Sequence, residues 1–273
     1  MALPDGRIAV ARGFGRNTGG AVVSASLSRY EIRAPDRAVA LAYDGPATCH
    51  TLEEMMQPGV GSGRTHRLRL TLDFAACAPT WDMHAAHHAD PTGIAGAMHI
   101  EQLGRVSGSV RLDGDELAIR DAVSCRDHSR GKRDISLFRN HCWINGVFPG
   151  GKGFQLYYFR MHGTDGPALS LATVIAEGAH HPAGIEHIEL VDGPDDFGRD
   201  HSVVLQSSLG EMRIAVRQVL ATLPLHMSAP FDPAFGVGRG SRGVLFDEAV
   251  RMQCNGETGF GWCERGFSRH RIR

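Results

Sequence analysis

The sequence predicts an all-β protein made of two antiparallel β-barrels or sandwiches side by side, with little helix. Short stretches alternate apolar and polar residues, and residues 66–74 do so strictly, as a half-buried strand does. Asp113-Gly114 and Asn255-Gly256 are two-residue hairpin signals between such stretches. No long segment shows a convincing 3.6-residue period. Together these observations indicate a series of short, hairpin-connected strands.

The same reading places the individual elements. The expected strands cover residues 20–27, 38–43, 66–74, 106–112, 116–123, 135–138, 143–148, 154–161, 169–176, 185–191, 201–207 and 211–220. The turn residues Asp44-Gly45-Pro46 are expected to end the second strand, and His180-His181 before Pro182 to form a turn. Residues 51–57 are the candidate for a single helical turn.

No sharp linker divides the chain, and its two halves look alike in kind, each a meander of hairpins. We therefore place the domain boundary at the charged run near the middle, giving an N-terminal barrel over residues 1–134 and a C-terminal barrel over residues 135–273. A closed antiparallel barrel of about eight strands has room for one small ligand. Two barrels side by side also form a cleft, where ligands often bind.

Composition excludes several classes of function. With 42% hydrophobic and 22% charged residues among 273, a packed core is expected, and a net charge of -1 favours neither nucleic acid nor an anionic membrane as partner. No apolar run approaches the ~18 residues of a transmembrane segment. The start carries no signal sequence and the six cysteines form no Cys-x-x-Cys pair, so we expect a cytoplasmic protein with reduced thiols and no zinc finger. The sequence allows either a monomer or a homodimer.

The most unusual stretch is the central run, residues 124–134, which holds three arginines, a lysine, two aspartates, a histidine and a thiol. Residues that favour burial flank it on both sides, and Asp127-His128 offers an acid/base pair. Buried charges require partners, and Arg126 and Arg133 lie beside the two aspartates. The run is either a structural ion-pair knot or the polar end of an apolar pocket, with at least two of its charges at a cavity wall.

Other candidate sites are weaker. Residues 81–90 contain three histidines and two aspartates, but Pro79, Pro91 and Gly93 indicate a solvated loop, with metal binding the minor alternative. The glycine-rich pieces 59–63 and 236–240 do not connect a strand to a helix, so they do not predict phosphate loops. Cys125 lies near cations, yet a buried inert thiol is the commoner state. We expect no metal and no cofactor.

Three motifs resemble those of a bacterial family of double lipocalin-like (calycin) proteins, which is more distantly similar to the hydroxyneurosporene synthase (carotenoid hydratase) group. They are residues 99–108, Leu112-Asp113-Gly114, and residues 125–134 with the pattern Arg-Asp-His-Ser-x-Gly-x-Arg-Asp; residues 259–265 fit the family's closing strand. The resemblance spans about residues 40–265. The family pattern has tryptophan where this chain has Arg130 and tyrosine where it has Ile100. The chain also begins late relative to that pattern, so a first strand or lid is expected to be absent or rearranged.

The resemblance implies a lipocalin-like fold, and the broader group includes enzymes that hydrate isolated double bonds. Adding water to an alkene needs a strong proton donor, such as a carboxylic acid kept protonated in an apolar pocket, and aromatic faces near the developing cation. The catalytic residues expected on this basis are Asp127, His128 and Glu264. The substrate-binding residues expected are Arg126, Arg133, Asp134, Glu101, Trp143, Tyr157 and Tyr158. Adjacent tyrosines on a strand point to opposite faces, so only one of Tyr157 and Tyr158 can line a barrel interior.

The resulting hypothesis is a lyase, a hydratase or dehydratase of secondary metabolism, that adds or removes water on a hydrophobic terpenoid, steroid or polyketide-like substrate. A non-catalytic carrier of an apolar small molecule and a pericyclase are the alternatives. Fold alone does not decide between them.

Overall fold

All the secondary-structure elements that the structure describes are strands. The computed structural model describes residues 22–24, 38–50, 64–83, 98–130, 138–193, 196, 198–227 and 243–268. The elements are β1 (Val22–Ser24), β2 (Ala38–His50), β3 (Arg64–Ala76), β4 (Trp81–Asp82), β5 (Met98–Leu112), β6 (Asp115–Arg130), β7 (Phe138–Val147), β8 (Gly153–Met161), β9 (Leu169–Ala176), β10 (Ala179–Ile188), β11 (His201–Ser207), β12 (Gly210–Met227), β13 (Gly243–Cys254) and β14 (Glu257–Ser268). The predicted all-β class is confirmed. Within these residues there is no helix long and apolar enough to cross a membrane.

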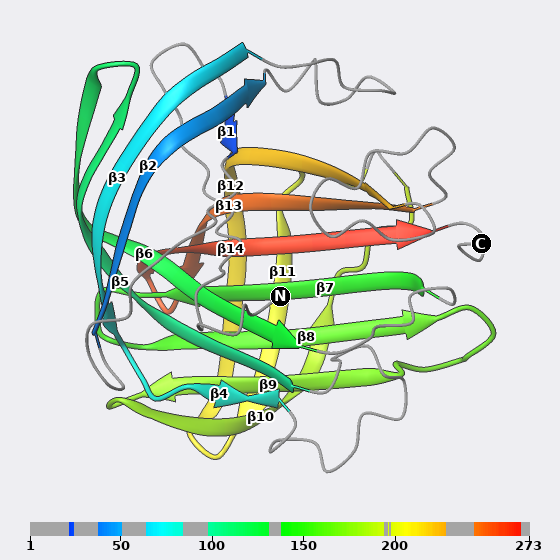
Figure 1. Ribbon diagram of the computed structural model, residues 1–273. Helices are drawn as coiled ribbons and strands as arrows, with labels where there is room; N and C mark the ends of the chain where they lie inside the picture. Colours follow the sequence, from blue (N-terminus) through cyan, green and yellow to red (C-terminus); the bar gives the residue numbers. More distant parts are fainter. Residues whose placement is uncertain are drawn as a thin grey trace. The chain divides into compact units, whose positions relative to one another are not determined.

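Strands β7 to β14 form a closed antiparallel barrel in which each strand pairs with the next along the chain (Figure 1). The last strand closes it, because β14 pairs with β7 from Phe260 opposite Val147 to Phe267 opposite Asn140. Glycine permits this close approach: a Cβ on Gly261 would lie 1.9 Å from the carbonyl oxygen of Asn145. An eight-stranded up-and-down barrel of this kind is the lipocalin-like architecture, and the expected closing strand at residues 259–265 lies within β14.

Most of the described interior positions of the barrel are filled by apolar side chains. The interior cluster comprises Cys142, Ile144, Phe148, Phe154, Leu156, Ala172, Val174, Val203, Leu205, Met212, Ile214, Val216, Val250, Met252, Cys254 and Cys263. Strand alternation places Tyr158 against this cluster and Tyr157 against a second one outside the barrel, so the two tyrosines face opposite ways as expected. The barrel interior is thus a packed core along these positions.

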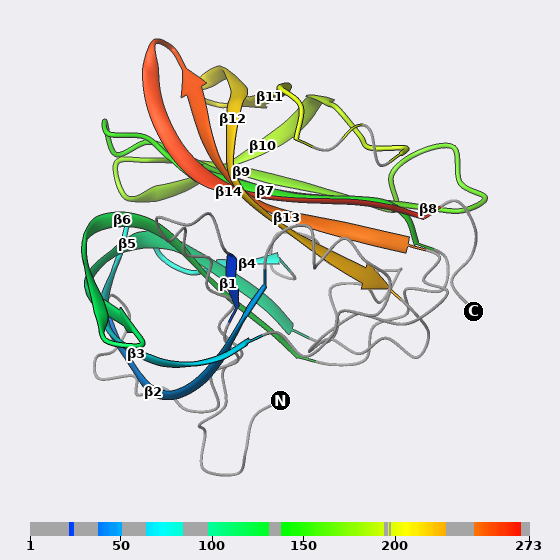
Figure 2. The same ribbon diagram turned by 90° about the horizontal axis from the view of Figure 1, so that it is seen from above.

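Strands β1 to β6 form a strongly curved six-stranded sheet in the order β1-β2-β3-β5-β4, with β6 pairing β5 (Figure 2). The strict alternation of residues 66–74 is observed in β3, where Arg69, Thr71 and Asp73 are exposed and Phe74 is buried. Both residues of the Asp113-Gly114 turn have positive φ, 51° and 106°, which confirms the hairpin between β5 and β6.

The chain divides into two compact units that share this hairpin. Residues 1–77 and 104–124 form the first unit, while residues 78–103 and 125–273 form the second. The first half of β5 and the last part of β6 therefore belong with the barrel. The expected division at residue 134 remains a prediction about which parts fold independently.

Three local expectations were wrong. Strand β2 does not end at Pro46 but continues to His50, because its pairing with β3 runs on through Pro46, opposite Arg67. Among the described residues β1 pairs only with Thr48–His50, so no described strand needs the missing N–H of the proline. Strand β10 contains His180 and His181, since the turn before it is Glu177-Gly178, both with positive φ. The strand expected over residues 116–123 does not end there but continues through the first part of the central run to Arg130, as β6. Residues 51–57, where a helical turn was expected, lie outside the described residues.

A buried polar cluster fastens the segment between β10 and β11 to the barrel. Arg265 pairs with Glu248 at 3.2 Å, and Glu248 accepts a hydrogen bond from the backbone N–H of Gly198. His201 Nδ1 lies 3.2 Å from the carbonyl oxygen of Arg199, and its Nε2 lies 3.5 Å from the sulfur of Cys263. These distances fit an imidazole that donates from Nδ1 and accepts the thiol proton at Nε2, which is the neutral form of histidine.

The state of His201 makes stability depend on pH. Burial, together with the positive charge of Arg265, lowers the pKa of His201 to about 4. As pH falls below about 6.5, His201 becomes protonated in the unfolded chain, whereas in the folded protein it becomes protonated only near pH 4. The free energy of unfolding therefore decreases between these two pH values, by at most about 3 kcal/mol. We expect the thermal unfolding temperature to fall less steeply over this window in His201→Asn than in the wild type.

The matched control is His187→Asn, which changes an exposed histidine of the same barrel and should keep the wild-type pH dependence. An equal slope in wild type and His201→Asn would show that His201 is protonated freely in the folded protein.

Candidate functional site

The barrel strands β7 and β8 are buried on both faces, although only one face points into the barrel. Their burial is nearly continuous, whereas β10 alternates between exposed and partly buried residues. The outer face is covered within the second unit by β4 and by the nearby part of β5, since Trp81 and Met83 pack with Phe138 and Tyr157 and the side chain of Gln155 bonds to Glu101. Polar side chains on this outer face are therefore buried, and they form the candidate site.

Two imidazole–carboxylate pairs lie in this layer, and the imidazoles of both contact Tyr157. His99 Nε2 is 2.9 Å from Asp127 Oδ1, and His141 Nε2 is 2.7 Å from Glu264 Oε1 in a close ion pair without an aligned hydrogen bond. The Tyr157 ring meets both imidazoles edge-on, with centroid distances of 5.8 Å to His99 and 5.0 Å to His141. Pairing register brings these groups together, because Trp143 is the partner of Glu264 on one side and of Tyr157 on the other.

Glu101 is a fully buried carboxyl group between these pairs. Its Oε2 accepts a hydrogen bond of 3.0 Å from Gln155, while Oε1 lies 3.5 Å from His99 Nε2 and has no hydrogen-bond partner. Burial raises the pKa of Glu101 to about 8 and the negative charge of Asp127 acts in the same direction, against the lowering effect of Trp143 and Gln155. The Trp143 indole N–H faces this carboxyl group without an aligned hydrogen bond.

The structure brings together many of the site residues expected from the sequence. Glu101, Trp143, Tyr157 and Glu264 all lie in the buried layer, with Asp127 at its half-exposed edge. Tyr158 faces the barrel interior instead, so it is not a neighbour of the others. Arg126 is partly buried in β6. The side chain of His128, and Arg133 and Asp134 altogether, lie outside the described residues.

The expected pairing inside the central run was wrong for Asp127. Adjacent residues of a strand point to opposite faces, so Arg126 and Asp127 diverge in β6. Asp127 pairs with His99 of β5 instead. Cys125 lies on the same face as Asp127, and burial, with the charges of Glu101 and Asp127, raises the pKa of its thiol well above the usual range. This agrees with an inert thiol rather than a reactive one.

His99, His141 and Gln155 were missed as site residues. The spacing of the two histidines from predicted site residues could have identified them. His99 is two residues from Glu101 on one strand and His141 is two residues from Trp143 on another, so each pair lies on one face of its strand. That these faces are covered is not visible in the local sequence. Of the histidine-rich stretch 81–90, only residues 81–83 are described.

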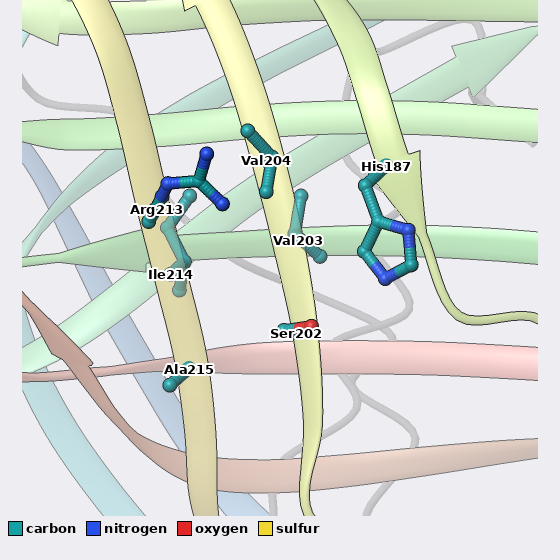
Figure 3. A pocket seen from close by; sticks show the side chains of 7 residues that line it. All are labelled: His187, Ser202, Val203, Val204, Arg213, Ile214 and Ala215. Atoms are coloured by element: carbon teal, nitrogen blue, oxygen red, sulfur yellow. The ribbon is translucent and has the colours of Figure 1, made fainter.

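A shallow hollow of about 390 Å³ lies elsewhere, on the outer face of β10, β11 and β12, with His187 and Arg213 on opposite sides (Figure 3). Both charged groups are exposed and already paired with neighbouring glutamates, His187 with Glu189 and Arg213 with Glu211. Exposed pairs of this kind contribute little binding energy. The buried layer around Tyr157 is the stronger candidate.

Comparison with known proteins identifies a family. Residues 16–268 match the domain described as a domain of unknown function, DUF7064, and the chain belongs to this family. No curated protein matches the chain. Among solved structures it is similar to a Nitrosomonas europaea protein provisionally described as AttH, with 12% sequence identity and a TM-score of 0.48 over 86% of this chain and 70% of that chain. Family membership leaves the activity to be argued from the site.

The half-exposed position of Asp127 predicts a modest role in stability. Its carboxylate is 44% exposed, so Asp127→Ala should lower the free energy of unfolding by only about 1 kcal/mol, through loss of the partner of buried His99. Asp127→Asn should retain more of it, because an amide oxygen still accepts a hydrogen bond. Urea unfolding monitored by tryptophan fluorescence measures both.

The exposed Glu211, which pairs with Arg213, provides the control: Glu211→Ala should change stability by no more than a few tenths of a kcal/mol. A loss of roughly 3–5 kcal/mol in Asp127→Ala would instead indicate a deeply buried pair.

Proposed function

We propose that this protein is a lyase that adds water to, or removes it from, a hydrophobic substrate by acid–base catalysis in the layer around Tyr157. The observation that carries the proposal is the presence of two imidazole–carboxylate pairs, one buried and one with a half-exposed carboxylate, whose imidazoles both contact one aromatic ring. Hydration and dehydration need two polar functions at once, one that moves a proton and one that holds the oxygen.

The His141–Glu264 pair suits the proton transfer. A carboxylate beside an imidazole fixes the orientation of the ring and stabilises its protonated form, as in other acid–base pairs. Only 7% of the His141 side chain and 15% of the Glu264 side chain are exposed, so their interaction is weakly screened. In this proposal the His141–Glu264 pair gives a proton to the substrate carbon in hydration and takes one from it in dehydration. The His99–Asp127 pair takes the proton that the adding water loses, or supplies the proton with which the hydroxyl departs as water.

The surroundings suit an apolar substrate that develops positive charge. The outer cluster next to the pairs contains Trp81, Met83, Phe138, Tyr157, Phe159, Leu169, Leu171 and Leu245, with Trp143 packed against it. Aromatic faces stabilise a cation that forms on carbon. Trp143 and Tyr157 lie on the same face as Glu264, so both belong to this environment in the proposed site.

The test is conversion of apolar alkenes and alkenols by the purified protein, followed by gas chromatography and mass spectrometry. We expect turnover to fall at least about 100-fold in Glu264→Gln and in His141→Asn, since a general acid–base group contributes that much. Glu189→Gln removes an exposed carboxylate of the same barrel, bonded to Ser202, and should retain wild-type turnover.

The variants also separate the alternative functions. Wild-type turnover in both Glu264→Gln and His141→Asn would remove the pair from catalysis and favour a pericyclase, which relies on shape. A compound that co-purifies with the protein, seen by native mass spectrometry, and stays unchanged on incubation would indicate a carrier. Either result would overturn the lyase proposal.

A further inference from the structure

The residues on the Asp127 side of the layer have the composition of a metal site. Three potential ligand atoms, one each from His99, Glu101 and Asp127, lie within 4.8 Å of one another. His99 Nε2 is the shared neighbour, 2.9 Å from Asp127 Oδ1 and 3.5 Å from Glu101 Oε1. The ligand atoms of a tetrahedral ion lie about 2.1 Å from the ion and roughly 3.4 Å from one another. Small side-chain movements would therefore allow all three ligand atoms to coordinate one ion.

An unfilled buried oxygen supports this reading independently. Glu101 is fully buried, yet its Oε1 has no hydrogen-bond partner and is directed at His99 Nε2. A buried oxygen without a hydrogen bond destabilises the folded protein unless a proton donor or a cation binds to it. The other oxygen, Oε2, is held by Gln155. A hydrogen bond that fixes one oxygen and leaves the other available is the usual support of a metal-binding carboxylate.

The charge balance also favours a cation. The carboxylates that interact with Glu101 are Asp127 and Glu264, both negative. In the part of the chain that the structure describes, no lysine or arginine forms an ion pair with Glu101 or Asp127. Asp127, at 44% exposed, connects the cluster to solvent and gives an ion a way in.

We propose that His99, Glu101 and Asp127 bind a divalent transition-metal ion of the Zn²⁺, Mn²⁺ or Fe²⁺ class. One imidazole and two carboxylates suit these ions better than Mg²⁺ or Ca²⁺, which prefer oxygen ligands throughout. Three protein ligands leave at least one coordination position open, as in catalytic rather than structural metal sites. Metal binding goes beyond the proposed lyase activity and does not require it.

The test is metal binding by the full-length protein after treatment with EDTA and dialysis. Isothermal titration with ZnCl₂ and with MnCl₂ should show one site per chain, and Co²⁺ should give visible absorption bands on binding. Glu101→Gln and Asp127→Asn keep the shape of each side chain and replace a carboxyl ligand with an amide, so each should weaken binding by about 100-fold or more. Gln155→Ala should weaken it by roughly 10–100-fold, the usual effect of a supporting residue.

The matched control is the His187–Glu189 pair, an exposed imidazole and carboxylate 3.7 Å apart; the double variant His187→Asn/Glu189→Gln should bind like the wild type. Circular dichroism and metal-free thermal unfolding verify that each variant is folded. If binding survives in Asp127→Asn and Glu101→Gln but is lost in the double variant His84→Ala/His88→Ala, the ion binds to the histidine-rich stretch and the proposal is wrong. The proposal is equally wrong if folded wild-type protein shows no one-site binding. Neither result bears on turnover by the His141–Glu264 pair, which is measured separately.

Discussion

The arrangement around the candidate site depends on one constraint, the burial of polar side chains on the outer face of a barrel. A barrel strand normally presents one apolar face inward and one solvated face outward. Here β4 and part of β5 cover the outer face of β7 and β8, so Gln155 and His141 are removed from water; Gln155 bonds to Glu101, and His141 pairs with Glu264 of β14. Buried polar groups of this kind must be paired or perform a function.

The two faces of the barrel wall solve this problem differently. Inside, Arg265 pairs with Glu248, which also accepts a hydrogen bond from the Gly198 backbone, and these contacts fasten the segment after β10 to the barrel. Outside, the Glu101 carboxyl keeps one oxygen unbonded and its charged neighbours are carboxylates. The inner pair joins opposite charges and so stabilises the fold, whereas a buried carboxyl group with carboxylates as neighbours marks a place where a proton, a substrate or an ion can bind.

Secondary structure followed the local sequence closely where turn chemistry was decisive. Asp113-Gly114 and Asn255-Gly256 adopt positive φ at both residues, as their composition predicts. Prediction was poorer where strand pairing outweighed the local turn residues, as at Pro46, which lies within β2 and pairs with Arg67 of β3. The central run is the clearest case: the expected strand ended at Val123, but pairing with β5 continued it to Arg130.

By itself the sequence determined the all-β class and the hairpin positions, because period-2 alternation and turn residues act locally. The candidate residues Glu101, Asp127 and Glu264 were expected from the resemblance to the double lipocalin-like family. The partners of those residues were decided only by the tertiary structure. Asp127 meets His99 through the pairing of β5 and β6, and Glu264 meets His141 through closure of the barrel between β14 and β7. Such contacts join residues far apart in sequence, and covering one face of the wall converts an alternation that normally indicates solvent exposure into a buried polar layer.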